Sequence, residues 1–217
     1  MKTIPRLARD SRCFGAALAA LIVCLAPLDS RAAAPGDLGR AVKAGDAAQW
    51  RALLADKPDL NATDAAGNSA LHFAALNHDA EAVRGLLAAG ADAKAANAAG
   101  ATPLHYGAGQ AEIVAALLGR GADPNAVAKS GATPLMAALA QPGSFPAVQA
   151  LIAAGADVRA PRGPEQAVML NRAILAGDRR AIDLLLSRNA VVNPATRIAP
   201  LALAAALGDG ESVRALL

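Results

Sequence analysis

A six-residue stretch occurs twice, almost unchanged, in the middle of the chain. GATPLH occupies residues 100–105, GATPLM occupies residues 131–136, and the related GNSALH occupies residues 67–72. A second series follows each of them, with LLAAGAD at 86–92, LLGRGAD at 117–123 and LIAAGAD at 151–157. Pairs that begin with leucine recur at offsets of 33, 31, 34, 34 and 31 residues, at Leu53, Leu86, Leu117, Leu151, Leu185 and Leu216. Self-similarity at a period near 33 residues predicts a row of like units, each stabilised by its neighbours.

Within each unit the residues predict two helices bounded by turns. Thr102 and Thr133 suit a helix N-cap, because a hydroxyl can accept a hydrogen bond from an orphan backbone N–H. Pro103 and Pro134 follow at the first helical position, where a missing N–H has no cost. Glycines that can take a positive φ stand before each first helix and after each second helix; they are Gly67, Gly100, Gly131, Gly90, Gly121 and Gly155. Aromatic residues make up only 2% of the chain, so leucine and alanine must form the buried faces.

The turn, first-helix and second-helix signatures recur together and in order, and this pattern resembles the ankyrin repeat. The match is carried by residues 64–95, 97–126 and 128–160, and it extends over most of residues 36–217. The resemblance implies an all-α solenoid of about six helix-turn-helix units with short β-turn fingers. The units are expected at 36–63, 64–96, 97–127, 128–160, 161–194 and 195–217, the last of them incomplete.

The copies are not equal. The first unit lacks the Thr-Pro start, and we interpret it as an N-terminal cap with Trp50 in the core. The third unit is two residues short between its helices, where Gly107 and Gly109 weaken the first helix. The fourth unit carries an insertion in the corresponding turn, at residues 141–146. The fifth unit has Asn189 where a glycine is expected.

The N-terminus has the composition of a secretory signal peptide. A basic start is followed by an uncharged run over residues 14–26 and by the small residues of SRAAAP. We predict that residues 1–32 are a signal peptide that is cut after Ala32, which places the mature protein in the periplasm or outside the cell. The alternative is an uncleaved anchor, which the short apolar run disfavours because a membrane span needs about 20 residues.

Removal of this leader also removes the excess positive charge. Residues 35–217 contain sixteen basic and sixteen acidic residues, so their charge gives no reason to expect nucleic-acid binding. Both cysteines, Cys13 and Cys24, lie in the leader, so we expect neither a disulfide nor thiol chemistry in the mature chain. We expect no cofactor, no membrane partner after cleavage, and a monomer.

Three histidines are the candidates for metal binding or catalysis. His72 and His105 occupy the same place in adjacent units. The resemblance implies a structural role for both, in which each imidazole forms hydrogen bonds near the turn and holds adjacent units in register. The alternative, a metal-binding enzyme that uses both imidazoles, is disfavoured because two ligands are too few for a metal site. His78 is expected in a solvated turn. Because no nucleophile, base and orienting group can be assembled, we expect no catalysis.

The resemblance implies a protein–protein interaction module that binds a partner through its turn tips and the concave face of its first helices. The candidate contact residues are Asn68, Leu76, Asn77, Tyr106, Lys129, Ser130, Gln141 and Phe145. Two of these have a second interpretation. Tyr106 is either a contact residue or a packed helix residue, and Phe145 either protrudes from its turn or folds back as a local plug.

A further alternative comes from the end of the array. The last unit stops at Leu217 within an apolar helix, with no polar outer cap. Because the terminal units of a solenoid need a soluble outer surface, the array could instead be a docking arm or spacer for a further C-terminal domain.

Overall fold

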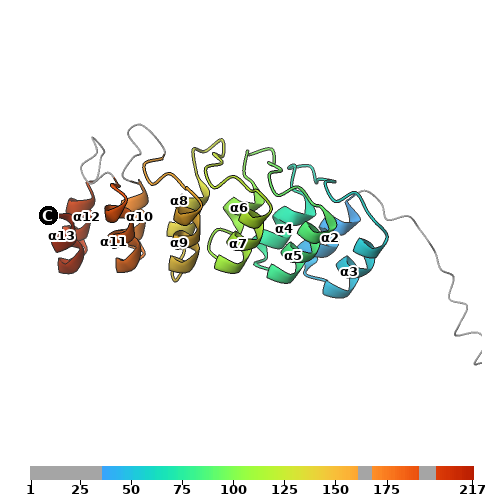
Figure 1. Cartoon of the computed structure of the whole chain (residues 1–217), viewed down its shortest axis with the longest axis horizontal. Coiled ribbons are helices and arrows are strands. Elements are labelled where there is room, and N and C mark those ends of the chain that lie inside the picture. Colours follow the sequence, from blue (N-terminus) through green and yellow to red (C-terminus); the bar gives the residue numbers. More distant parts are fainter. Residues whose placement is uncertain (1–35, 161–167, 191–198) are drawn as a thin grey trace, which may run out of the picture. The chain divides into compact units, whose positions relative to one another are not determined.

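The computed structural model describes residues 36–160, 168–190 and 199–217, which all belong to one unit, Ala33–Leu217. The predicted signal peptide lies outside the described residues. These residues form successive helix pairs (Figure 1), and the only β pairing among them is an isolated antiparallel bridge between Thr63 and Ser69. The helices are α2 (Asp37–Ala44), α3 (Ala47–Ala55), α4 (Ala70–Leu76), α5 (Ala80–Ala89), α6 (Pro103–Tyr106), α7 (Ala111–Gly119), α8 (Pro134–Leu139), α9 (Phe145–Ala153), α10 (Val168–Leu175), α11 (Arg179–Ser187), α12 (Pro200–Ala206) and α13 (Gly210–Leu216). In the described part of the chain, none of these helices is long and apolar enough to cross a bilayer.

Side chains at the helix starts explain where the helices begin. Aspartates open four of the second helices, where each carboxylate accepts a hydrogen bond from the N–H three residues on, at 2.9–3.2 Å; they are Asp46, Asp79, Asp178 and Asp209. The predicted cap at Thr133 is confirmed, because its hydroxyl accepts from the Met136 N–H at 3.3 Å. Such caps satisfy backbone donors that a short helix otherwise leaves without partners.

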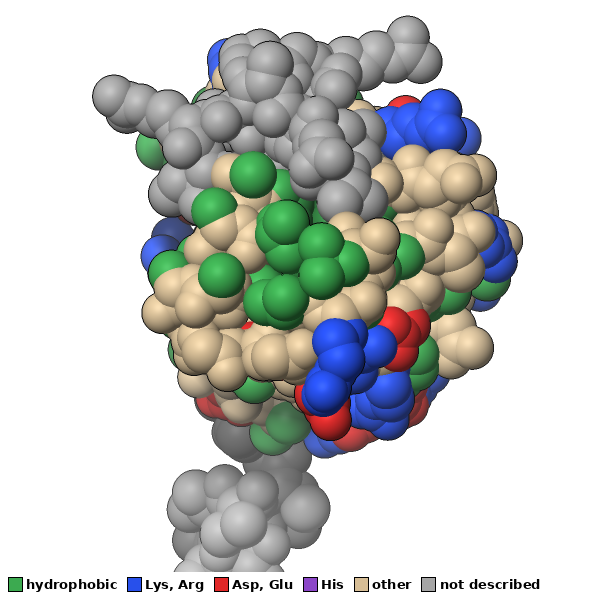
Figure 2. All heavy atoms as spheres, turned by 90° about the vertical axis from the view of Figure 1, so that its left-hand side faces the viewer, with side chains coloured by type: hydrophobic (Ala, Val, Ile, Leu, Met, Phe, Trp, Pro, Cys, Tyr) green, Lys and Arg blue, Asp and Glu red, His purple; other side chains and the backbone are tan. Residues whose placement is uncertain are grey.

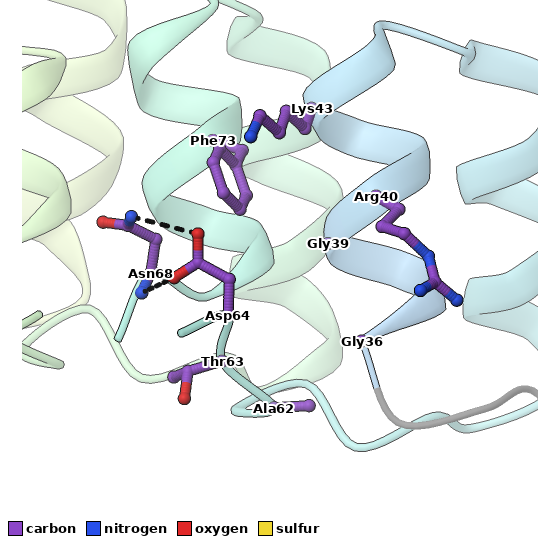
Figure 3. A pocket seen from close by; sticks show the side chains of 9 residues that line it. All are labelled: Gly36, Gly39, Arg40, Lys43, Ala62, Thr63, Asp64, Asn68 and Phe73. Atoms are coloured by element: carbon purple, nitrogen blue, oxygen red, sulfur yellow. Dashed lines mark hydrogen bonds between the residues drawn. The ribbon is translucent and has the colours of Figure 1, made fainter. Parts of the chain in front are cut away.

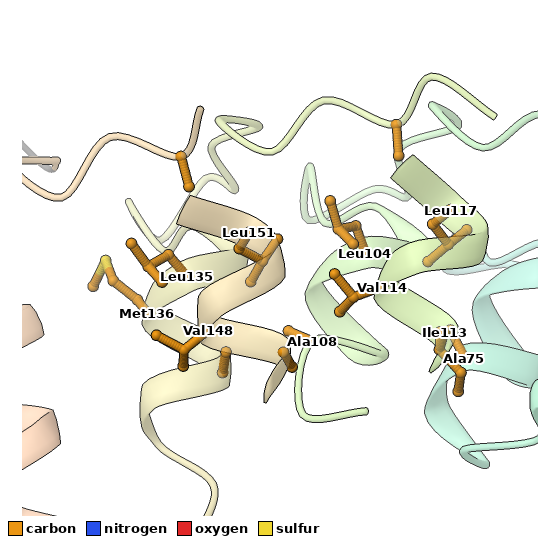
Figure 4. Close-up of a cluster of buried hydrophobic side chains, with 14 of the residues drawn as sticks. Ala75, Leu104, Ala108, Ile113, Val114, Leu117, Leu135, Met136, Val148 and Leu151 are labelled. Carbon is orange, nitrogen blue, oxygen red and sulfur yellow. The ribbon is translucent and has the colours of Figure 1, made fainter. Parts of the chain in front are cut away.

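Neighbouring pairs pack helix against like helix. The first helices α2, α4, α6, α8, α10 and α12 contact one another in that order, and so do the second helices from α3 to α13. Leucines of both layers are fully buried between them (Figure 4); they include Leu71, Leu86, Leu104, Leu117, Leu135 and Leu151. Burying one leucine side chain contributes about 1.5–3 kcal/mol. The predicted all-α row of mutually supporting helix pairs is therefore confirmed.

The first unit closes one end of this core. Trp50 of α3 is only 3% exposed, which confirms its predicted place in the core. Its ring lies against Gly85 of α5, where an added Cβ would approach the ring to 3.3 Å. Leu38 and Val42 of α2 are buried as well. The cap therefore uses its single tryptophan to cover the second-helix layer and aliphatic side chains to cover the first-helix layer.

Backbone hydrogen bonds tie the turns of adjacent units together. The Ala98 N–H donates to the Ala66 carbonyl and the Lys129 N–H to the Ala99 carbonyl, both at 2.9 Å. Gly67 permits this approach, because its φ is 79° and an added Cβ would lie 2.8 Å from the Ala98 nitrogen. The turn glycines are thus needed for the spacing between units as well as for the turn itself.

The insertion in the fourth unit is shorter than the sequence suggests. Helix α9 begins at Phe145, so the prediction that this residue lies in the turn is wrong. The Ser144 hydroxyl donates to the Ala138 carbonyl at 2.6 Å and closes the turn, which lets the helix start at the next residue. The Phe145 ring is half-buried, and the Arg180 guanidinium lies 4.6 Å from its centroid. The ring therefore packs onto the array instead of protruding.

The short third unit generates a test of its packing. An added Cβ at Gly107 would overlap Cγ2 of Ile113, a side chain that is stiff and 1% exposed. We expect Gly107→Ala to lower the free energy of unfolding by about 1–3 kcal/mol, measured by urea denaturation. The matched control is Gly119→Ala in α7, where an added Cβ meets nothing within 4 Å. Equal stability of the two variants would contradict this account of the shortened unit.

Candidate functional site

The turns expose small side chains at their tips. The exposed tip residues of three successive turns are Ala65, Ala66, Ala98, Ala99, Lys129 and Ser130, which we call the tip surface. The backbone bonds between turns hold these residues at fixed spacing. Lys129 and Ser130 are therefore exposed on the tip surface, where the sequence places them. Exposed alanines leave room for a partner to approach the backbone closely.

Behind the tip surface, His72 links two units. Its Nδ1 accepts from the Ser69 N–H at 3.1 Å and lies 2.9 Å from the Ser69 hydroxyl. Its Nε2 lies 3.1 Å from the Ala101 carbonyl of the next unit. Because Nδ1 accepts a hydrogen bond from the backbone N–H, it carries no proton, and Nε2 is the ring nitrogen that donates. One imidazole thus connects the start of its own helix to the neighbouring turn.

His105 repeats this arrangement one unit further on. Its Nδ1 accepts from the Thr102 N–H at 3.1 Å, and its Nε2 lies 3.1 Å from the Ala132 carbonyl. The predicted structural role of both histidines is confirmed by these bonds. Removal from water lowers the pKa of both imidazoles, because burial disfavours the charged form. No group of three or more potential metal ligands occurs among the residues that the structure describes.

Asn97 forms a second link that the sequence analysis missed. Its side-chain NH₂ donates to Asn68 Oδ1 at 2.8 Å and to the Tyr106 hydroxyl at 2.9 Å, and its Oδ1 accepts from the Ala99 and Ala101 N–H groups. Two predicted contact residues, Asn68 and Tyr106, therefore have their polar atoms bound within the array. The Tyr106 hydroxyl bonds to Asn97, which favours its interpretation as a packed residue. Asn97 occupies the place that Asp64 has in the preceding unit, and this correspondence was the available signal.

Three further candidates lie where the first helices end. Leu76 is the last residue of α4 and is 51% exposed. Asn77 is the C-cap of α4, and Gln141 lies two residues beyond the end of α8, within the turn that carries the predicted insertion. The Asn77 amide donates to the Val42 carbonyl at 2.8 Å, and the Gln141 amide fills the space that the absent side chain of Gly109 leaves. Of the three, only Leu76 presents an exposed apolar side chain.

Exposed apolar side chains also occur toward the C-terminal units. Leu175 of α10 is 65% exposed and lines a pocket of about 440 Å³ together with Leu139 and Pro142. Figure 2, seen from the side of α12 and α13, shows hydrophobic side chains gathered on that end of the array. Leu207 and Leu217 are 54% and 89% exposed there.

Charged side chains concentrate on the other layer. Arg51 of α3 donates to Glu81 of α5 at 2.6 Å, and Arg84 of α5 pairs with Glu112 of α7. Because both pairs are exposed to solvent, each contributes little to the stability of the fold. They occupy the second-helix surface with charges that already have partners. The tip surface, which carries Lys129 as its charged side chain, is chemically different and available for other contacts.

The two buried histidines generate a pH prediction. Their pKa is lowered in the folded state, while the unfolded value is about 6.5, so the unfolded chain binds more protons as the pH falls through that value. Stability from this source is complete above about pH 6.5 and is lost as the pH falls toward the folded-state pKa. We expect the free energy of unfolding to decrease between pH 8 and pH 5 in urea denaturation.

The double variant His72→Gln/His105→Gln should flatten that pH dependence. It should also lower stability at pH 8 by about 1–3 kcal/mol per lost hydrogen-bonding group. His78→Gln is the matched control, because His78 is exposed in a turn at a φ of 55°. An unchanged slope in the double variant would show that other groups cause the pH dependence.

Comparison with known families agrees with this geometry. The family described as ankyrin repeats (3 copies) matches residues 38–128, and the single ankyrin repeat matches residues 130–162. The two matches together cover more than half of the 217 residues. The comparison with curated proteins gave no match. Ankyrin repeats are generally protein–protein interaction modules and are typically not catalytic. The structure supports the same assignment, because each unit has two helices, successive turns are hydrogen-bonded and an imidazole joins neighbouring units. The chain therefore belongs to the ankyrin-repeat family.

Proposed function

We propose that this chain is an exported, non-catalytic scaffold that binds a partner protein through the tip surface and the adjoining first helices. The observation that carries the proposal is the contrast between the two sides of the array. The second-helix surface carries two ion pairs between neighbouring units, from α3 to α5 and from α5 to α7. The tip surface consists of exposed alanines with one serine and one lysine, and backbone hydrogen bonds join its successive turns.

Rigidity matters for this proposal because ordering a loop on binding costs free energy. A partner that meets turns already fixed in place loses little conformational entropy of the array. Lys129 and Ser130 supply a charged and a hydroxyl contact on that surface, and Leu76 supplies an exposed apolar contact at the C-terminal end of the first helix α4. Asn68 and Tyr106 support the surface from behind through Asn97.

Blocking the tip surface tests the proposal. The chain with residues 1–32 removed would serve as bait in a periplasmic extract, and the captured protein would be titrated by calorimetry. We expect Ala66→Arg, Ala99→Arg and Lys129→Glu each to weaken binding at least tenfold, which is about 1.4 kcal/mol. The matched control is Gln149→Arg, an exposed position on the second helix α9.

The same titration separates the proposal from its alternative. Binding that persists in all three tip variants would overturn the assignment of the surface. Loss of binding in Leu207→Gln alone would instead place the captured partner on the exposed apolar side chains at the end of α12.

Export is tested separately by expressing the full chain in a Gram-negative bacterium. We expect the protein in the periplasmic or secreted fraction with an intact mass that begins at Ala33, because the basic start and apolar run direct secretion. A control that lacks residues 2–32 should remain in the cytoplasm. Recovery of the uncut chain in the membrane fraction would instead indicate the anchor.

A further inference from the structure

A pocket of about 250 Å³ lies between α2 and α4 (Figure 3). Its lining residues are Gly36, Gly39, Arg40, Lys43, Ala62, Thr63, Asp64, Asn68 and Phe73. The residues at the starts of the first helices explain why this pocket is open. Gly36 is the N-cap of α2, as Ser69 is of α4 and Thr102 is of α6. Three residues further on, α4 and α6 each carry a histidine, whereas α2 carries Gly39.

The pocket is therefore the counterpart of the space that an imidazole fills in the next two units. In the second unit, His72 lies edge-on to the Tyr106 ring, with centroids 6.1 Å apart. The residue that corresponds to Tyr106 is Phe73, which lines the pocket. An added Cβ at Gly39 would lie 3.9 Å from the Phe73 ring, at ordinary contact distance. A Cβ at this position would thus fit without displacing the walls.

The carbonyls that face these spaces support the correspondence. The Ala101 carbonyl accepts from the Asn97 N–H at 3.0 Å and also from His72, and the Ala132 carbonyl accepts from the Ala128 N–H at 3.0 Å and also from His105. The corresponding Asn68 carbonyl accepts from the Asp64 N–H at 3.0 Å. Within the described residues it has no second donor. A carbonyl oxygen has two lone pairs, so one position for a donor is left.

We infer that this pocket binds a small planar ring that donates an N–H to the Asn68 carbonyl, namely a histidine side chain presented by the partner protein. The Phe73 ring supplies the apolar wall, and Lys43 covers that ring with its Nζ 5.1 Å from the centroid (Figure 3). Asp64 and Asn68 form the polar wall and are bonded to each other through Asn68 Nδ2 at 3.3 Å. The presentation of the histidine by a protein rests on the proposed function, whereas the ring-binding pocket does not.

Free imidazole tests the pocket without a partner. Imidazole would be titrated into the ¹⁵N-labelled chain at pH 8, where the ring is neutral, and followed by NMR. We expect saturable shifts at Gly39, Asn68 and Phe73 with a dissociation constant on the order of 1–10 mM, the range open to a five-atom ligand. Oxazole, which has the same size and no N–H, should bind at least tenfold more weakly.

Variants that fill the pocket provide a second test of the inference. Gly39→His and Gly39→Leu should both weaken imidazole binding at least tenfold, and Gly39→His should have the higher midpoint of thermal unfolding because only it donates to Asn68. Gly119→Leu, in open space on α7, is the matched control and should leave imidazole binding unchanged.

Several results would overturn the inference: no saturable shifts, equal binding of oxazole, or equal loss of binding in the Gly119 control. A blocked histidine peptide, acetyl-histidine-amide, should bind as imidazole does if a partner's side chain is the ligand. If imidazole binds and acetyl-histidine-amide does not, the conclusion that the ligand is a histidine side chain of a partner protein is overturned. If the chain captures a partner through the tip surface but does not bind imidazole, the pocket inference is contradicted and the proposed function still stands.

Discussion

Burial of leucine between neighbouring helix pairs is the interaction on which this array depends. Each pair has two short helices, and helices of this length are marginal by themselves in water. The leucines of both layers are fully buried, and each layer contacts the like layer of the neighbouring pair. The stability of any one unit is therefore largely the stability of its two interfaces. This dependence also explains why small residues dominate, since alanine lets the helices of adjacent units approach closely.

Packing of leucine against leucine does not by itself fix how far one pair slides along the next, so directional bonds must set the register. On the tip side, His72 and His105 donate to the turn carbonyls of the following units. Where Met136 replaces the histidine, Arg172 of the next unit donates to the Met136 carbonyl at 3.1 Å. At three successive interfaces, a side chain thus donates a hydrogen bond to a backbone carbonyl of the neighbouring unit. The donor belongs to the earlier unit at the first two of these interfaces and to the later unit at the third.

Periodicity predicted the fold because its cause is local. Cap residues, turn glycines and leucine spacing act within a few residues of one another, and even Asn189 takes the positive φ of 58° that its glycine-like place requires. The candidate contacts were harder to predict, because a residue's exposure depends on the neighbouring unit. The Asn68 amide accepts a hydrogen bond from Asn97 of the adjacent unit, and the Gln141 amide occupies the space beside Gly109, and neither arrangement follows from the residue's own unit. Phe145 was misplaced because the bond from Ser144 to the Ala138 carbonyl could not be inferred from spacing.

The first interface shows what happens when the tip-side donor is missing. Here Gly39 stands in place of the histidine, and the side-chain bond between the two first helices lies at their other end, where Asn77 donates to the Val42 carbonyl. Helix α2 is thus fixed near its C-terminus and by the burial of Leu38 and Val42, while the side near Gly36 is left with a pocket. At this first interface, the turn carbonyl of Asn68, whose counterparts at Ala101 and Ala132 hold register, is left with bonding capacity. A missing structural contact in a repeat array therefore leaves a recess whose shape and hydrogen-bonding pattern are set by the side chain that the other units keep.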